Sequence, residues 1–371
     1  MEKVLIFGGA FDPPHSEHVT MCKSAMKELG ISKLVIVPTY TPPHKSASFL
    51  NFEDRCELIK VAFRDVDFVI DNVEKVRGKD NYSALILPIL KQKYGDITYL
   101  IGGDSLEYFS NWYNPQAIVD TCPIAVCARE GFDDISSTAQ ALEKKYGGKF
   151  ILLNCSGRDV SSSEIKAKLL MGEEPCELDC KVLDKIREMH LFEECKDMAI
   201  KLCSYQTQEL FEHSKAVVLT AMRLNSLHNL KQDFKKVFLA CFLHDNAKKR
   251  PSLDGLNVPL DAVGTPVLHQ FLGAEKAKRD FDIQDAEVLD AIRYHTTAKA
   301  DMTTLEKLVY TADSVSFDRT YDPIPAIRDI AMHDFDEGFK AVLRYTYQKV
   351  SASGKGMHPL TQQAVDCYLD D

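Results

Sequence analysis

Short apolar runs alternate with amphipathic stretches along the first half of the chain. Five runs have the length of buried strands: Lys3–Phe7, Lys33–Val37, Asp96–Ile101, Ile124–Ala128 and Lys149–Leu153. Between them apolar residues recur at helical spacing, as in Val19–Leu29 and Phe52–Ala62. Short buried strands separated by helices are typical of a parallel sheet with helices on both faces. The first half is therefore predicted to be an α/β domain.

The pattern changes near residue 190. From Glu193 onward helical periodicity continues with almost no strand signal. The predicted helices are Asp197–Leu210, Ser214–Leu224, Asp233–Leu243, Gln270–Asp280, Ala286–Tyr294 and Leu305–Val315. The second half is predicted to be all-α, and we expect two domains, residues 1–193 and 194–371.

Composition excludes several classes of protein. The 371 residues are 45% hydrophobic and 27% charged, which suits a globular protein rather than a disordered one. A net charge of −10 argues against general binding to nucleic acid or to anionic membranes, and the apolar runs are too short to span a bilayer. The eleven cysteines are scattered, and the first residues read as a strand rather than a signal peptide. We expect reduced thiols, a cytoplasmic location and no nucleic-acid or membrane partner; the oligomeric state stays open, a homo-oligomer included.

The string GGAFDPPHSEH, residues 8–18, follows the first predicted strand. Gly8 and Gly9 allow a ligand to approach the backbone, and the two prolines suit the first turn of a helix. His15 and His18 are three residues apart and so share one helical face, at a helix end where N–H groups favour an anion. We predict a phosphate site at which both imidazoles donate hydrogen bonds and stabilise the charge of a transition state.

This string resembles the signature GxFDPxHxGH of the nucleotidyltransferase superfamily, and more narrowly the bacterial nicotinate-nucleotide adenylyltransferases. Further matches follow in order: VPTYTPPHK (37–45), Arg55 in FEDRCELIKVAF, IGGDSLEYFSNWYNP (101–115) and VSSSEIKAKL (160–169). The resemblance covers residues 1–193 and implies a Rossmann-like nucleotidyltransferase domain. The implied reaction transfers AMP from ATP to nicotinate mononucleotide, with Mg²⁺ on the ATP, and releases pyrophosphate.

The resemblance also implies roles for single residues. His15, His18 and Lys45 would act catalytically on the phosphates, and Trp112 would stack on the nicotinate ring. The further nucleotide- and substrate-binding candidates are Gly8, Gly9, Phe11, Asp12, Asp104, Ser162 and Ser163. Ser161 to Ser163 are also N-cap residue types, which predict a helix beginning near Glu164. Glu17 and Lys166 depart from the family pattern, and NYSALIL (81–87) matches its pyridine-recognition segment loosely, so the choice between nicotinate and nicotinamide mononucleotide stays open.

A second set of candidates lies in the helical half. Its members are His213, His244, Asp245, His269, His295 and Asp313. An aspartate at the end of an apolar helix is costly to bury unless it is paired, and a metal ion would pair with it. Imidazole and carboxylate ligands without cysteine suit Fe, Mn or Zn. We predict a metal site.

The order H…HD…H…H…D resembles the HD phosphohydrolase superfamily. HDNAKK and AIRYHTTAKADMTTLEKLVYTADSVSFDR resemble more closely the bacterial HD-domain hydrolases that split diadenosine tetraphosphate (Ap4A) symmetrically. That resemblance covers about residues 197–340 and implies two metal ions, iron by association, bridged by Asp245, which would act catalytically. It makes Lys248, a catalytic candidate, and Arg319 candidates for binding the phosphates.

These resemblances predict a bifunctional enzyme whose ligands are ATP, nicotinate mononucleotide and Ap4A. Two alternatives stay open for the helical half. It could be a regulatory module that senses a nucleotide, or it could hydrolyse another nucleotide phosphoester, because HD motifs do not define the substrate.

Overall fold

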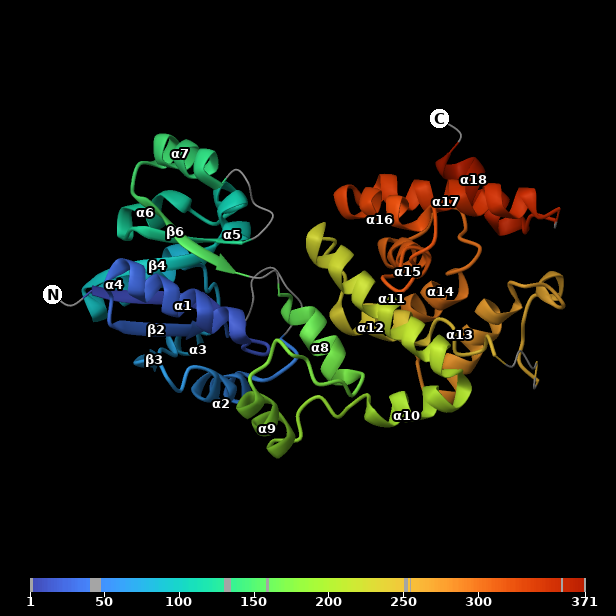
Figure 1. Cartoon of the computed structure of the whole chain (residues 1–371), viewed down its shortest axis with the longest axis horizontal. Coiled ribbons are helices and arrows are strands. Elements are labelled where there is room, and N and C mark those ends of the chain that lie inside the picture. The colour runs from blue at the N-terminus through green and yellow to red at the C-terminus, as the bar shows by residue number, and fades with distance from the viewer. Residues whose placement is uncertain are drawn as a thin grey trace. The chain divides into compact units, whose positions relative to one another are not determined.

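The computed structural model of the chain describes residues 3–40, 48–129, 135–157, 160–249, 253, 255–354 and 356–369. It divides into two compact units, drawn in Figure 1. One consists of residues 1–166 and 174–191, and the other of residues 167–173 and 192–371. The expected boundary between residues 193 and 194 concerns where the two predicted activities divide, and it stays a prediction. Lys45 lies outside the described residues.

The first unit alternates strands and helices. Its strands are β1 (Lys3–Gly9), β2 (Lys33–Pro38), β3 (Phe68–Ile70), β4 (Asp96–Gly102), β5 (Ile124–Arg129) and β6 (Phe150–Gly157). Its helices are α1 (Ser16–Leu29), α2 (Phe52–Ala62), α3 (Val73–Arg77), α4 (Ser83–Tyr94), α5 (Gly103–Glu107), the 3-10 turn η1 (Phe109–Asn111), α6 (Pro115–Thr121), α7 (Ile135–Tyr146), the start of α8 (Ser162–Leu170) and α9 (Cys180–Glu188).

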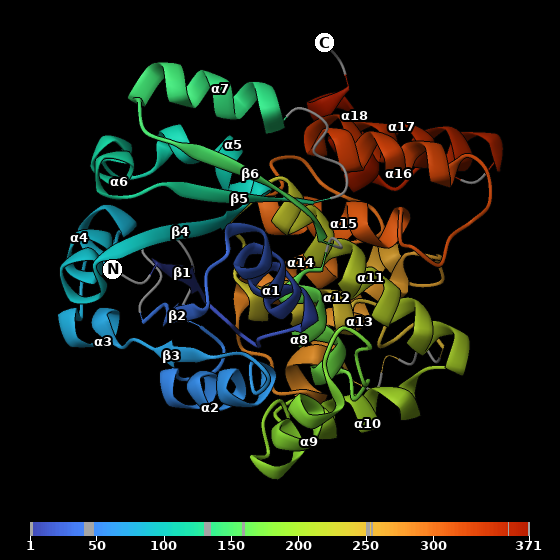
Figure 2. The same cartoon turned by 60° about the vertical axis from the view of Figure 1, so that its left-hand side comes forward.

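The six strands form one parallel sheet in the order β3-β2-β1-β4-β5-β6, seen from the side in Figure 2. Successive side chains of a strand point to opposite faces. On β1, Val4 and Ile6 accordingly join the core beneath α4, α6 and α7, whereas Leu5 and Phe7 join the core beneath α1 and α2. The predicted α/β class is confirmed. The strand order reverses at β1 and β4, and such a switch point leaves a crevice beyond the strand ends.

The second unit consists of helices joined by loops, with no strand among its described residues, as predicted. Beyond the end of α8, its elements are α10 (Lys196–Tyr205), α11 (Gln208–Leu227), α12 (Phe234–Leu243), the 3-10 turn η2 (Leu260–Ala262), α13 (Leu268–Asp280), α14 (Ala286–Arg293), α15 (Thr304–Ser314), α16 (Ile324–His333), α17 (Phe335–Ala352) and α18 (Pro359–Tyr368). Helices α11, α12, α14 and α15 pack on one another. Among the described helices, none has the length and apolar character required to cross a membrane.

Several local predictions were wrong. The expected helix Asp197–Leu210 is two helices, because Thr207 adopts an extended backbone and caps α11 by accepting a hydrogen bond from the Leu210 N–H. The two prolines precede α1 instead of forming its first turn, which makes His15 the N-cap residue. Cys127 and Cys155 lie on the neighbouring strands β5 and β6 with their Cα atoms 5.7 Å apart, and the expectation of reduced thiols stays a prediction.

Candidate active sites

His15 and His18 lie together at the start of α1, next to the crevice. Their rings stack with centroids 3.7 Å apart and an angle of 26° between planes. The His15 backbone N–H donates to Nδ1 of His18 at 3.2 Å. A ring nitrogen that accepts a hydrogen bond carries no proton, so in the neutral ring the proton is on Nε2. His18 Nε2 is thus a donor suited to a phosphate oxygen.

The loop that leads to this pair is held by Asp12. Its buried carboxylate accepts hydrogen bonds from the N–H groups of Phe49 at 2.9 Å and Leu50 at 3.0 Å. Lys166 Nζ donates to the same carboxylate at 2.9 Å. Through these three hydrogen bonds, Asp12 holds the loop after β1 against the segment before α2 and against α8. This arrangement gives Asp12 a positioning role, and direct contact with a substrate stays a prediction.

Arg55 ties together the loops that follow β1 and β2. Its guanidinium donates to the carbonyl of Ala10 at 2.6 Å and to that of Thr39 at 2.7 Å, and the residue is 1% exposed. Burial lowers the pKa of Arg55, although nearby carboxylates oppose the effect. Arg55 belongs to the family match at FEDRCELIKVAF but lay outside the predicted set of site residues. The available signal was its position on the apolar stripe of α2, three residues from both Phe52 and Leu58.

Three other candidates lie at the carboxyl edge of the sheet. Gly8 and Gly9 end β1, and Asp104 is in the first turn of α5, directly after the neighbouring strand β4. A Cβ on Gly9 would lie 3.3 Å from the Phe11 ring, a tight contact. The remaining candidates are Ser162 and Ser163, which open α8 earlier than expected, and Trp112, which is partly buried and follows η1 with its ring centroid 5.3 Å from that of Phe109.

A small cavity lies between α4 and the strands β1, β2 and β4. Its lining includes Gly8, Glu74, Ser83 and Tyr99. The Ser83 and Tyr99 hydroxyl oxygens are 3.2 Å apart. Burial raises the pKa of the Glu74 carboxyl to about 7, although the carboxylate accepts a hydrogen bond from the Tyr40 N–H at 2.9 Å. Glu74 is therefore a titrating group beside the crevice, and it was absent from our predicted site.

The second unit brings all six predicted metal ligands together. His213 lies on α11, His269 on α13 and Asp313 on α15. The remaining ligands follow helices directly: His244 and Asp245 after α12, and His295 after α14. Three of the rings are oriented in the same way, because Nδ1 lies at hydrogen-bond distance from the backbone carbonyl three residues earlier. The pairs are His244 with Cys241 at 2.7 Å, His269 with Pro266 at 2.8 Å and His295 with Ile292 at 2.7 Å.

Asp245 lies between two groups of histidines. Its Oδ2 atom is 3.3 Å from Nε2 of His244, and its Oδ1 atom is 3.4 Å from Nε2 of both His269 and His295. The side chain of Asp245 is fully buried. Oδ2 thus faces His244, which with His213 forms the first imidazole set, and Oδ1 faces the second imidazole set, His269 and His295. This is the arrangement expected of a ligand that bridges two ions.

The first imidazole set is completed by Asp313. Its Oδ1 atom is 2.9 Å from Nε2 of His213 and 3.8 Å from Nε2 of His244. His213, His244 and Asp313 can together offer ligand atoms to one ion, and His244, Asp245 and His295 form an overlapping set. His269 falls outside these two sets but approaches the same Asp245 oxygen as His295.

The donor atoms fit a metal ion. Nε2 of His244, Oδ1 of Asp245 and Nε2 of His295 are buried, and none of them has a hydrogen-bond partner among the described residues. Leaving buried polar atoms unpaired is costly, and a cation would satisfy all three. Burial also lowers the pKa of His244, and lowers that of His269 to about 4, which favours the neutral imidazole that binds metals. The set therefore suits a divalent ion.

Two basic side chains border these carboxylates. Lys248 Nζ donates to Oδ2 of Asp245 at 2.6 Å, and Arg319 donates to Oδ1 of Asp313 at 2.7 Å. Burial opposes ionisation of Asp245, yet His244 and Lys248 hold the pKa of this carboxyl well below its usual range. Arg319 and His213 have the same effect on the pKa of Asp313. Both predicted phosphate-binding residues thus lie beside the metal ligands.

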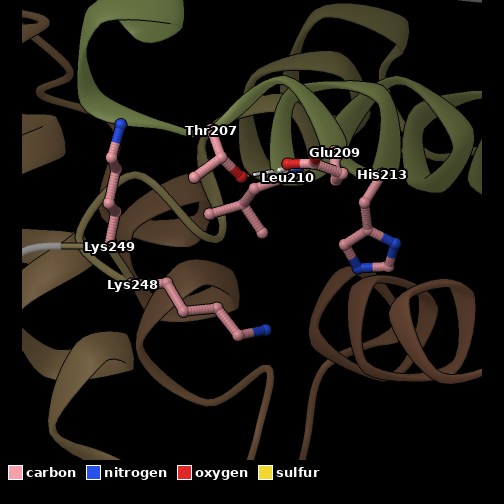
Figure 3. Close-up of a pocket in the computed structure, with 6 residues that line it drawn as sticks. All are labelled: Thr207, Glu209, Leu210, His213, Lys248 and Lys249. Atoms are coloured by element: carbon pink, nitrogen blue, oxygen red, sulfur yellow. Dashed lines mark hydrogen bonds between the residues drawn. The ribbon is translucent and has the colours of Figure 1, made fainter.

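A pocket of about 390 Å³ opens beside this cluster (Figure 3). It is lined by Thr207, Glu209, Leu210, His213, Lys248 and Lys249. The Lys248 side chain extends into the space that the His213 ring borders, whereas the Lys249 amine points away and donates to the carbonyl of Gln206 at 3.2 Å. A ligand in this pocket would meet one lysine and one edge of the metal cluster.

Two supporting residues of the cluster were missing from the sequence prediction. Gln270 is fully buried and accepts hydrogen bonds from the N–H groups of Thr296 and Thr297, so it fixes the turn that follows His295. Asp318 accepts from Nδ1 of His213 at 2.9 Å. The only sequence signal for them was their position next to a predicted residue, His269 for Gln270 and Arg319 for Asp318.

Two known families match different parts of the chain. The family described as cytidylyltransferase-like matches residues 6–168, and the HD domain matches residues 210–318. A Mycoplasma genitalium protein named probable nicotinate-nucleotide adenylyltransferase/Ap4A hydrolase is 27% identical over 363 residues, which cover 94% of this chain and 99% of the relative. A probable nicotinate-nucleotide adenylyltransferase of Endomicrobium trichonymphae is 32% identical and covers 45% of this chain and 85% of its own. A solved structure from Clostridium acetobutylicum, described as a predicted HD superfamily hydrolase involved in NAD metabolism, is 28% identical, covers 46% of this chain and 93% of its own, and has a TM-score of 0.42.

Proposed function

This chain belongs to the nicotinate-nucleotide adenylyltransferase family, and we propose that it is a bifunctional enzyme with an HD-type hydrolase in its second half. The first half would transfer AMP from ATP to nicotinate mononucleotide, and the second would hydrolyse Ap4A to two ADP. The whole-length relative that carries both activities in its name supports this pairing. The proposed division of labour follows residues 1–193 and 194–371.

In the first half, the phosphate of the mononucleotide would attack the α-phosphorus of ATP, and pyrophosphate would leave. The stacked His15 and His18 at the start of α1 carry this proposal. The Nε2–H of His18 would donate to a phosphate oxygen whose charge grows in the transition state. Ser162 and Ser163 would hold the far end of the triphosphate at the start of α8. Mg²⁺ bound with ATP would neutralise part of the charge.

In the second half, water would attack one inner phosphorus atom of Ap4A, and the P–O bond between the two inner phosphates would break. The observation that carries this proposal is Asp245, whose two oxygens face separate imidazole sets. His213, His244, Asp313 and Asp245 would hold one ion, and Asp245, His269 and His295 the other. Metal ions bound there would activate the water and stabilise the phosphoryl oxygens. The imidazole and carboxylate ligands suit iron, manganese or zinc. We propose iron because the resemblance to the HD-domain Ap4A hydrolases implies it, with manganese and zinc as alternatives.

The basic residues would act on the substrate. Lys248 and Arg319 each donate a hydrogen bond to a carboxylate of the metal cluster. Because both cations lie at the edge of the cluster, each can bind a phosphate oxygen of Ap4A. The pocket beside His213 and Lys248 would accept one of the ADP halves. Trp112 in the first half would stack on the pyridine ring of the mononucleotide.

Product analysis on the full-length chain tests both halves. We expect dinucleotide and pyrophosphate from ATP with nicotinate mononucleotide, and less from ATP with nicotinamide mononucleotide. We expect ADP as the sole nucleotide product from Ap4A when metal is present. A preference for nicotinamide mononucleotide would overturn the substrate assignment. If the chain binds Ap4A without consuming it under any of the three metals, the second half is a sensing module instead.

A further inference from the structure

The four histidines of the metal cluster are not oriented by the same kind of partner. His244, His269 and His295 each have Nδ1 against a neutral backbone carbonyl. His213 instead has Nδ1 2.9 Å from Oδ2 of Asp318, a carboxylate 105 residues away in sequence. Its Nε2 atom is 2.9 Å from Oδ1 of Asp313. Among the four rings, only His213 thus lies between two carboxylates.

The chemistry of these partners differs. A carbonyl oxygen fixes the tautomer and the direction of the ring but adds no charge. A carboxylate does the same and also makes the ring a stronger electron donor, so that metal affinity rises. Carboxylate partners of this kind typically change metal affinity 10–100-fold when they are removed.

Asp318 cannot act as a ligand of the same ion. It contacts Nδ1 of His213, whereas Asp313 lies at the Nε2 atom on the other side of the ring. The Asp318 side chain is also 39% exposed, whereas that of Asp313 is 13% exposed. Its influence on the cluster therefore passes through the His213 ring, and it is a positioning residue.

The two imidazole sets also differ in negative charge. The set of His213 and His244 has Asp313 and one oxygen of Asp245, and Asp318 stands behind it. Among the described residues, the carboxylate oxygen found beside His269 and His295 is the other oxygen of Asp245. Lys248 and Arg319 offset part of the carboxylate charge at the first set. What distinguishes this set is therefore the carboxylate of Asp318 behind the His213 ring.

We infer that Asp318 makes the His213–His244–Asp313 position the tighter of the two metal positions, so that a divalent ion fills it first. This inference rests on the proposed hydrolase site and deepens it. It concerns the order in which metal ions fill the two positions. It also assigns a role to Asp318, which is not among the predicted metal ligands.

Zinc binding to the metal-stripped full-length chain tests the inference, by competition with a chromophoric chelator. The unchanged chain should bind two Zn²⁺ ions with unequal Kd. Asp318→Ala should weaken the tighter position 10–100-fold and leave the weaker one within threefold. Asp318→Asn should cause a smaller loss, because its amide oxygen still accepts from the ring but carries no charge. Asp329→Asn on the exposed face of α16 removes the same charge and should change neither Kd.

Two results would overturn the inference: unchanged Zn²⁺ affinity in Asp318→Ala, or equal weakening of both positions, which indicates a general structural role. If circular dichroism shows that Asp318→Ala does not fold, Asp318→Asn takes its place in the test. The Kd of its tighter Zn²⁺ position must then be higher than the corresponding Kd of Asp329→Asn. Ap4A turnover is measured separately. Absence of turnover with normal Zn²⁺ binding refutes the proposed hydrolase and leaves the role of Asp318 standing.

Discussion

Asp12 and Lys166 form an ion pair of 2.9 Å between residues that are 154 positions apart, and their side chains are 5% and 12% exposed. The pair joins the loop after β1 to the middle of α8. In the adenylyltransferase family pattern an arginine occupies the position of Lys166. The pair thus connects two of the segments that we assign to ATP.

Replacing Lys166 by alanine should destabilise the protein by about 1–3 kcal/mol, because the buried Asp12 carboxylate loses a charged partner. Lys166→Arg keeps the charge and should retain most of this stability. Chemical denaturation measures the effect, with Lys23→Ala on the exposed face of α1 as the control. Equal stability of Lys166→Ala and Lys23→Ala would contradict a structural role for the pair.

Replacing His18 by alanine should lower kcat for dinucleotide synthesis about 10²–10³-fold with a much smaller change in KM for ATP. The reason is that the His18 donor acts on charge that develops only in the transition state. Steady-state kinetics on ATP and nicotinate mononucleotide give both constants. His333→Ala, an exposed imidazole at the end of α16, is the control and should change neither. Full activity in His18→Ala would remove the transition-state role.

Glu74 should make stability depend on pH. Its pKa is about 7 in the folded protein, against an ordinary value of 4.5, so the folded state keeps a proton that the unfolded chain releases. The free energy of unfolding should therefore fall as pH rises from about 4.5 to about 7, by up to about 3 kcal/mol, and should then level off. Glu74→Gln should lack this slope while its amide oxygen still accepts from Tyr40.

Denaturation of both proteins across this pH range gives the difference directly. Glu107→Gln, which replaces an exposed glutamate of α5, should run parallel to the unchanged chain. If Glu74→Gln also runs parallel to it, the Glu74 carboxyl is not the group that titrates.

The sequence predicted elements whose pattern is local and missed those that depend on tertiary contacts. Five of the six strands described were recognised, because each is a buried apolar run. β3 was missed: it has only three residues, and Val69 at its centre is 40% exposed. The break at Thr207 was missed because apolar spacing continues across it from α10 into α11.

The candidate sites follow the same rule. The six metal-ligand candidates were recognisable as an ordered set of residue types, and the structure places them together. Asp318 could not be assigned in this way, because its partner His213 is 105 positions away and its place next to Arg319 does not indicate this contact. The role of Arg55 likewise depends on where the carbonyls of Ala10 and Thr39 come to lie.

The most direct test of two separate sites is Asp245→Ala, assayed for both reactions on one preparation of full-length protein. Loss of the carboxylate that faces both imidazole sets should reduce ADP formation from Ap4A to background. Synthesis of the nicotinate dinucleotide from ATP should stay within twofold of the unchanged chain. Retained hydrolysis, or loss of both activities in a folded variant, would contradict the account.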